Sequence, residues 1–137
     1  MTIAQRMLDY AKQYQEVNVK QYQRAFEEIE NVLEDSEQVV FAATADSYVR
    51  NEQPAMWYAA YALTKRRLII GGERTKGMIM VSYATESIPL CDIQSVESAN
   101  SFMNAWIVIN TFHDELKLEL KSPEMARKIV KTMNSMI

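Results

Sequence analysis

Residues 64–72, Thr-Lys-Arg-Arg-Leu-Ile-Ile-Gly-Gly, constrain the fold of this 137-residue chain more than any other stretch. Residues 64–66 predict a turn, and residues 67–70 predict a short buried strand. The apolar run at residues 55–63 comes just before the turn, which indicates two strands joined as a hairpin. The chain's three glycines, at positions 71, 72 and 77, indicate that the second strand stops sharply in one loop with unusual backbone needs.

Short apolar segments on both sides of this hairpin predict about seven strands. No helical stretch separates one strand from the next, which favours an antiparallel sheet. Residues 46–54 are polar and contain Pro54, so we predict a loop there. The last strand alternates leucine with charged residues, as expected when one face meets the core. The predicted strands are residues 39–44, 55–63, 67–70, 78–84, 93–96, 105–112 and 115–120.

The N-terminal residues 2–34 are predicted to be helical. They contain no Gly or Pro and are rich in Gln, Glu, Ala, Lys and Arg, which favour helix. Apolar residues recur at helical spacing over residues 3–14 and again over residues 22–33. The two stripes are out of phase near residues 17–19, so we expect either two helices or one helix bent there.

A second helical region is predicted at the C-terminal end. Ser122 followed by Pro123 is typical of a helix start, with serine as the N-cap and proline in the first turn. Apolar residues then recur at helical spacing over residues 125–137. A terminal amphipathic helix of this kind can cover the open end of a folded sheet.

Two predicted strands are apolar at every position, at residues 105–109 and 78–81. A strand with one face in water should alternate, so we expect both faces of these strands to be covered. The N-terminal segment has apolar stripes that can provide this cover. We predict that it packs on the sheet of its own chain or of a second subunit, and two-fold dimers are the commonest oligomers. The interface candidates are Tyr22, Phe26, Trp106 and Ile107.

Two stretches resemble the motifs of a known family. Residues 64–69 are similar to the Thr-x-Lys/Arg-Arg-Leu strand of small bacterial pleckstrin-homology-like (PH-like) domains, the YokE-like group. Residues 88–96, Ile-Pro-Leu-Cys-Asp-Ile-Gln-Ser-Val, are similar to its Ile-Pro-Leu-x-x-Ile-x-x-Val stretch. GRAM domains share much of this pattern. The resemblance, from about residue 34 onward, implies an α+β fold. An N-terminal helical segment, 1–34, precedes a PH-like domain, 35–137, which is a seven-stranded antiparallel sandwich or partial barrel capped by a C-terminal helix.

The resemblance also bears on function, because it marks a fold more than an activity. Eukaryotic relatives often bind inositol phospholipids through basic residues in the first hairpin loop. In this chain the corresponding loop, residues 46–54, carries Arg50 together with the acidic Asp46 and Glu52. The loop therefore departs from the pattern of a phosphoinositide-binding domain.

Composition narrows the function classes. The net charge of −3 disfavours a general nucleic-acid binder, which is usually basic. The longest apolar run, residues 55–63, is far shorter than the ~20 residues of a membrane-spanning helix. The first residues lack the pattern of a signal peptide, and a single cysteine, Cys91, precludes an internal disulfide. We expect a cytoplasmic protein.

Catalytic and metal-binding motifs are not evident. The single histidine, His113, lies in a predicted turn, and Cys91 is expected to be a small buried residue. Residues 71–77 lack the Gly-Lys-Ser/Thr ending of a phosphate-binding loop. We therefore predict a non-enzymatic module without cofactor or metal. The competing class is a small enzyme that uses carboxylates alone, which would need paired acidic residues in a deep pocket.

Basic residues near the central hairpin are the only ligand-binding candidates. They fall at the two ends of the second hairpin strand, so they are not expected to form one patch. We predict protein–protein interaction or homo-oligomerisation as the function. The alternative is peripheral binding of an anionic lipid or phosphate head group by these residues. They are Lys65, Arg66, Arg67, Arg74 and Lys76.

Overall fold

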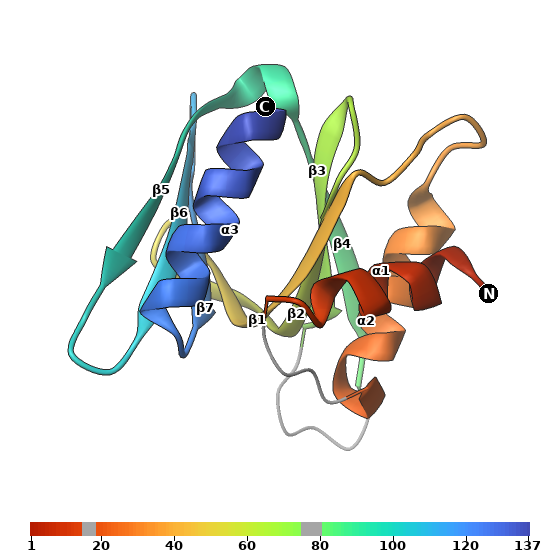
Figure 1. Ribbon diagram of the computed structural model, residues 1–137, viewed down its shortest axis with the longest axis horizontal. Helices are drawn as coiled ribbons and strands as arrows, with labels where there is room; N and C mark the ends of the chain where they lie inside the picture. The colour runs from red at the N-terminus through yellow and green to blue at the C-terminus, as the bar shows by residue number, and fades with distance from the viewer. Residues whose placement is uncertain (15–18, 75–80) are drawn as a thin grey trace.

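The computed structural model describes residues 1–14, 19–74 and 81–137. Within these residues two helices come first, seven strands follow, and a third α-helix ends the chain (Figure 1). The elements are α1 (Ile3–Ala11), α2 (Val19–Val32), β1 (Phe41–Arg50), β2 (Gln53–Leu63), β3 (Arg67–Glu73), β4 (Tyr83–Pro89), the 3-10 turn η1 (Leu90–Asp92), β5 (Ile93–Asn100), β6 (Ala105–Thr111), β7 (Glu115–Leu120) and α3 (Pro123–Met136).

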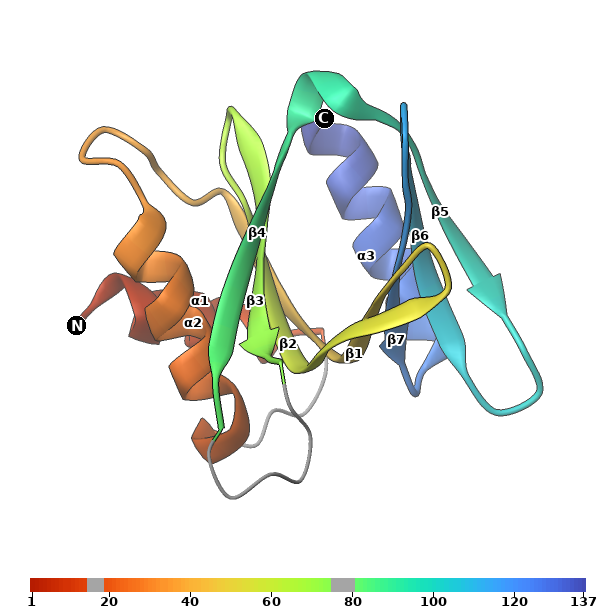
Figure 2. The ribbon, with the colours of Figure 1, turned by 180° about the vertical axis from the view of Figure 1, so that it is seen from behind.

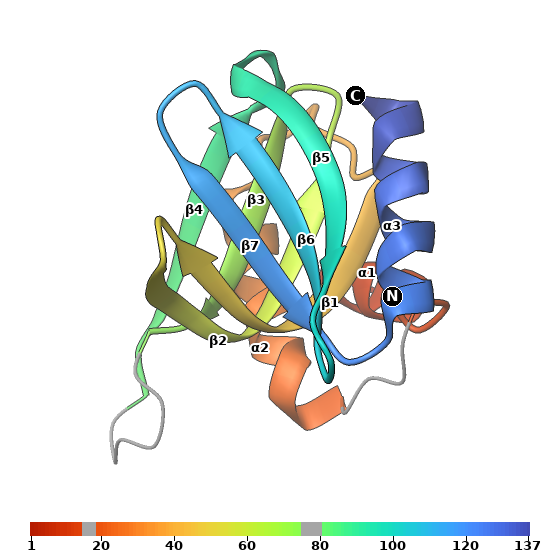
Figure 3. The same cartoon turned by 90° about the vertical axis from the view of Figure 1, so that its left-hand side faces the viewer.

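The seven strands form one antiparallel sheet in the order β4-β3-β2-β1-β7-β6-β5. β1 is shared between two halves of the sheet, because it pairs with β2 over most of its length and with β7 over residues 47–50. The sheet bends there, so the two halves face each other (Figure 3). In the described part of the chain β4 and β5 do not pair with each other. The fold is therefore an open sandwich or partial barrel, which confirms the predicted fold class.

The core lies between the two halves of the sheet. β7 buries Leu116, Leu118 and Leu120, as its alternating sequence predicts. α3 packs on β5 and β6 at the corner between the halves. The Ser122 hydroxyl oxygen accepts a hydrogen bond from the amide of Met125 at 3.2 Å, which confirms the predicted helix start.

The N-terminal segment forms two helices that make an outer layer on β1, β2 and β3 (Figure 2). α1 begins with a capping box, in which Thr2 and Gln5 each bond the backbone of the other. The sheet presents mostly alanine here, so the helices can approach its backbone closely. The segment thus packs on the sheet of its own chain. The buried residues of this layer include Met7, Leu8, Tyr22, Phe26 and Ile29 from the helices and Ala42, Ala60, Ala62 and Ile69 from the sheet.

β6 is not covered in the predicted way. Ile107 and Ile109 point into the core, whereas Trp106 and Val108 point outward and are only half-buried. The prediction that the N-terminal segment shields residues 105–109 is wrong, because its helices lie on the other half of the sheet. The outer side of β6 therefore keeps accessible apolar surface. Most of the second apolar run, at residues 78–80, lies outside the described residues.

The prediction that Gly71 and Gly72 end the strand is also wrong, since both lie within β3. Their role is close packing. A Cβ atom on Gly71 would lie 3.0 Å from the carbonyl oxygen of Ala25 and 3.2 Å from Cγ1 of Ile29, both in α2. Glycine at this position lets α2 rest directly on the sheet. Gly77 lies outside the described residues.

Gly71→Val is expected to lower the free energy of unfolding by about 1–3 kcal/mol, because the added side chain would push α2 away from β3. Gly71→Ala should have a smaller effect of the same sign. Urea denaturation measures both changes. The control is Ala99→Val at an exposed strand position, which should stay within about 0.5 kcal/mol of the wild type. A Gly71→Val protein as stable as the wild type would contradict the close packing.

The loop predicted at residues 46–54 is instead a continuation of the two strands. β1 and β2 meet at a two-residue turn, Asn51 and Glu52, whose φ angles are 51° and 66°. Two positive φ angles are the signature of a type I′ hairpin turn, in which asparagine is favoured. Pro54 is tolerated because it sits at an irregularity in the pairing, on a part of β2 that has no β3 partner.

β4 and β5 also differ from their predicted bounds. β4 runs from Tyr83 to Pro89, whereas the predicted strand covered residues 78–84, of which 78–80 lie outside the described residues. β5 continues to Asn100. β4 is an edge strand with polar residues at its centre, so its sequence lacks a strong apolar signal. Its pairing with β3 over seven residues, from Arg67 to Glu73, sets its length instead.

Candidate functional site

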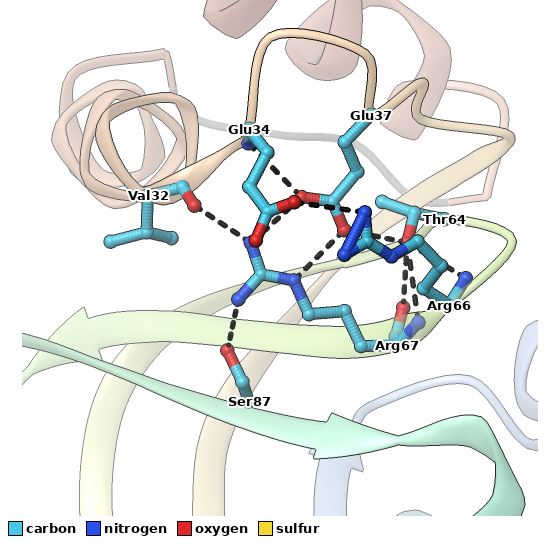
Figure 4. Close-up of polar contacts among 7 residues, drawn as sticks. All are labelled: Val32, Glu34, Glu37, Thr64, Arg66, Arg67 and Ser87. Atoms are coloured by element: carbon cyan, nitrogen blue, oxygen red, sulfur yellow. Dashed lines mark hydrogen bonds and ion pairs between the residues drawn. The ribbon is translucent and has the colours of Figure 1, made fainter.

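Thr64 organises the turn between β2 and β3, where the basic candidates lie. Its hydroxyl oxygen accepts hydrogen bonds from the amides of Arg66 and Arg67, each at 3.2 Å. The same hydroxyl donates to Oε2 of Glu37 at 2.8 Å (Figure 4). Threonine at this position therefore joins the turn to the segment that follows α2.

Glu37 and Arg67 form a buried two-point ion pair. Arg67 donates from Nε to Oε2 of Glu37 at 2.8 Å and from Nη2 to Oε1 at 2.7 Å. The Glu37 side chain is 1% exposed and that of Arg67 is 22% exposed. Arg67 also donates to the backbone oxygen of Val32 at 2.7 Å and to Oγ of Ser87 at 2.8 Å. One guanidinium thus ties α2, the segment after it and β4 to the start of β3.

The hydrogen bonds from Arg67 hold the pKa of the Glu37 carboxyl well below its ordinary value of 4.5, at about 2, although burial opposes this shift. Because folding lowers this pKa, the ionised Glu37 carboxylate makes its full contribution to the stability of the fold above pH 4.5. This contribution is lost as the pH falls toward 2. The shift corresponds to about 3 kcal/mol.

We therefore expect urea-unfolding free energies of the wild type to fall by about 3 kcal/mol more than those of Glu37→Gln between pH 5 and pH 2. Glu97→Gln, which removes an exposed carboxylate, is the matched control and should follow the wild-type profile. Parallel profiles for the wild type and Glu37→Gln would show that the carboxylate is not held in this way.

The structure separates the four basic candidates that it describes. Arg67 forms a buried ion pair with Glu37, and Arg66 forms an ion pair with Glu34 at 2.8 Å on the surface. Lys65 and Arg74 are exposed, at opposite ends of β3, whose seven residues span about 23 Å. Lys76 lies outside the described residues. The described candidates therefore do not form one cationic site.

Arg50, in the first hairpin, is also held within the chain. It donates from Nη2 to Oδ2 of Asp114 at 2.8 Å and forms a second ion pair with Glu86. Asn51 adds a hydrogen bond to Asp114 at 2.7 Å and accepts one from the amide of Glu115. These contacts lock the β1–β2 turn to the β6–β7 turn.

Apolar side chains are exposed on the β5–β6 hairpin. Phe102 is fully exposed and Met103 is 78% exposed, at a tip closed by a bond from the amide of Ser101 to the oxygen of Asn104. This pair was not among the residues predicted from the sequence to be functional. The sequence does contain a signal for it, since two large apolar residues stand between the turn-forming Ser101 and Asn104.

The four interface candidates have different environments. Ile107 is buried in the sandwich core, and Tyr22 and Phe26 are side chains of α2 that are buried against the sheet. Trp106 alone keeps accessible surface, on the outer side of β6. Trp106 and the Phe102–Met103 tip belong to the same hairpin of β5 and β6.

The remaining polar candidates do not assemble into a reactive site. His113 is exposed in the β6–β7 turn. Cys91 is exposed rather than buried as predicted, because it lies in the 3-10 turn at the end of the sandwich. In the part of the chain that is described, no three His, Cys, Asp or Glu side chains are grouped to hold a metal ion. No described helix is long and apolar enough to cross a membrane.

Comparisons with known proteins agree with this architecture. No curated protein matches the chain at a significant level. Among solved structures it is similar to one titled "Critical structural role for the PH and C1 domains of the Vav1 exchange factor", with a TM-score of 0.51 and 14% identity. That likeness covers 96% of this chain and 36% of the other, and it supports the fold alone. A family model described as "Bacterial PH domain" matches residues 33–135, and the chain therefore belongs to the bacterial PH domain family.

Proposed function

We propose that this chain is a non-enzymatic module that binds protein, and that it does so through the outer side of the β5–β6 hairpin. The PH-like fold supports a binding module in general. The observation that carries the proposal is the contrast between the two candidate surfaces. Arg66 and Arg67 are used in contacts within the chain, whereas Phe102, Met103 and Trp106 remain accessible.

The proposed partner is a second copy of the chain. Beside Trp106 the outer side of the sheet carries both charge signs, since Glu119 pairs across from Trp106 and Lys117 pairs across from Val108. An apolar centre with both signs around it is complementary to itself across a two-fold axis. Aromatic residues of this kind carry most of the binding energy at protein interfaces.

Sedimentation velocity over a concentration series tests this proposal. The wild type is expected to form a dimer, and Trp106→Ser and Phe102→Ser are each expected to weaken it about tenfold or more. Phe112→Ser is the matched control, because Phe112 is 61% exposed at the tip of a different hairpin. A wild type that stays monomeric throughout the series would rule out self-association through this surface.

The alternative, binding of an anionic head group, rests on Lys65 and Arg74. Neither makes an ion pair with a described residue. They lie at opposite ends of β3, however, and are therefore far apart. Each isolated cation would contribute only ~1 kcal/mol near an anionic membrane. This arrangement favours protein over lipid as the partner.

A further inference from the structure

A cavity of about 370 Å³ lies between α1 and the extended segment that leads into β1. Ile3, Met7 and Tyr10 line it from the helix, and residues 38–42 line it from the other side. Its volume is within the range of small-ligand pockets, about 300–1,000 Å³. Met7 and Phe41 are buried, whereas Ile3 is exposed and Val39 is half-buried. The cavity thus opens to solvent, and its accessible apolar wall comes from Ile3, Val39 and Val40 beside the polar Arg6 and Gln38.

The charges that line this cavity are unbalanced. The guanidinium of Arg6 makes no hydrogen bond or ion pair with any residue in ranges 1–14, 19–74 and 81–137. Glu37 also lines the cavity, but Arg67 and Thr64 hold its carboxylate. The negative charge is therefore already neutralised, and the positive charge of Arg6 is available to a ligand.

We propose that this cavity binds an amphipathic organic anion, with an aliphatic tail between α1 and β1 and a carboxylate on Arg6. An apolar tail is favoured because the accessible side chains of Ile3, Val39 and Val40 offer it no polar partner. A carboxylate is favoured because a planar guanidinium matches its two oxygens. This site is separate from the β5–β6 surface, so it stands or fails independently of the proposed self-association.

Titration with hexanoate, octanoate and decanoate, followed by calorimetry and amide chemical shifts, tests the site. Affinity should rise roughly threefold to fourfold for each buried methylene, from about 0.8 kcal/mol per group. The largest shifts should fall in residues 3–10 and 37–42. Arg6→Gln should weaken octanoate binding about tenfold and change 1-octanol binding by less than about twofold.

Two controls distinguish this site from general adhesion. Lys65→Gln removes an exposed charge elsewhere, and Phe102→Ser removes the exposed apolar tip, so neither should change octanoate affinity. Arg6 is exposed, so its variant should fold as the wild type does. The proposal is overturned if octanoate does not bind at millimolar concentration, if binding is insensitive to Arg6→Gln, or if it is lost with Phe102→Ser.

Discussion

A chain that begins at Glu34, without α1 and α2, is expected to aggregate or to be largely unfolded at 25 °C. The two helices cover the outer face of β1, β2 and β3. Burying a large apolar side chain contributes about 1.5–3 kcal/mol, so Met7, Leu8, Phe26 and Ile29 together contribute on the order of 10 kcal/mol before ordering costs. That is comparable to the whole stability of a small domain.

Size-exclusion chromatography and thermal unfolding of the truncated and full chains measure this effect. Adding residues 1–33 as a separate peptide should restore part of the lost stability. The helices are held on the sheet by side-chain contacts and not only by the covalent link to β1. A truncated protein that is monomeric, soluble and as stable as the full chain would show that the helices are an independent appendage.

Glu37→Ala is expected to lower the free energy of unfolding by about 3–5 kcal/mol at pH 7. The substitution leaves the partly buried guanidinium of Arg67 without its counter-charge, and breaking a buried pair in this way is strongly destabilising. Urea denaturation measures the change. In Glu37→Ala/Arg67→Ala the loss should be smaller than the sum of the two single losses, because both act on one contact.

The ion pair between Arg66 and Glu34 is the matched control for this prediction. It joins the same two segments at a similar distance, but both of its side chains are 59% exposed. Glu34→Ala should therefore cost no more than about 1 kcal/mol. Equal losses for Glu34→Ala and Glu37→Ala would contradict the distinction between a buried structural pair and a surface pair.

The order of helices and strands could be predicted because it depends on local patterns. The alternating leucines of β7 and the Ser122-Pro123 start of α3 each report the environment of their own element. The misassignments share a different cause. Gly71 was predicted to end a strand because the sequence around it does not show that α2 packs against this position. The α2 residues that approach Gly71 lie more than 40 positions earlier in the chain. Tertiary packing overrode a local preference.

The basic candidates could be found from the sequence, but their partners could not. Arg67 meets Glu37 across 30 positions, and Arg50 meets Asp114 across 64. A single sequence shows that these residues are basic and shows nothing about which carboxylate lies opposite. The same reason explains why the cavity beside Arg6 was missed, since its walls come from α1 and from the segment before β1.

The central claim is that Arg66 and Arg67, in the Thr64–Arg67 stretch, make contacts within the fold rather than bind a lipid. Flotation with vesicles that contain anionic lipid, compared with neutral vesicles at physiological salt, tests it most directly. We predict that the protein does not float with either kind of vesicle. Flotation with anionic vesicles that weakens with salt and is lost in Lys65→Glu/Arg66→Glu would contradict the claim and make an anionic lipid the partner.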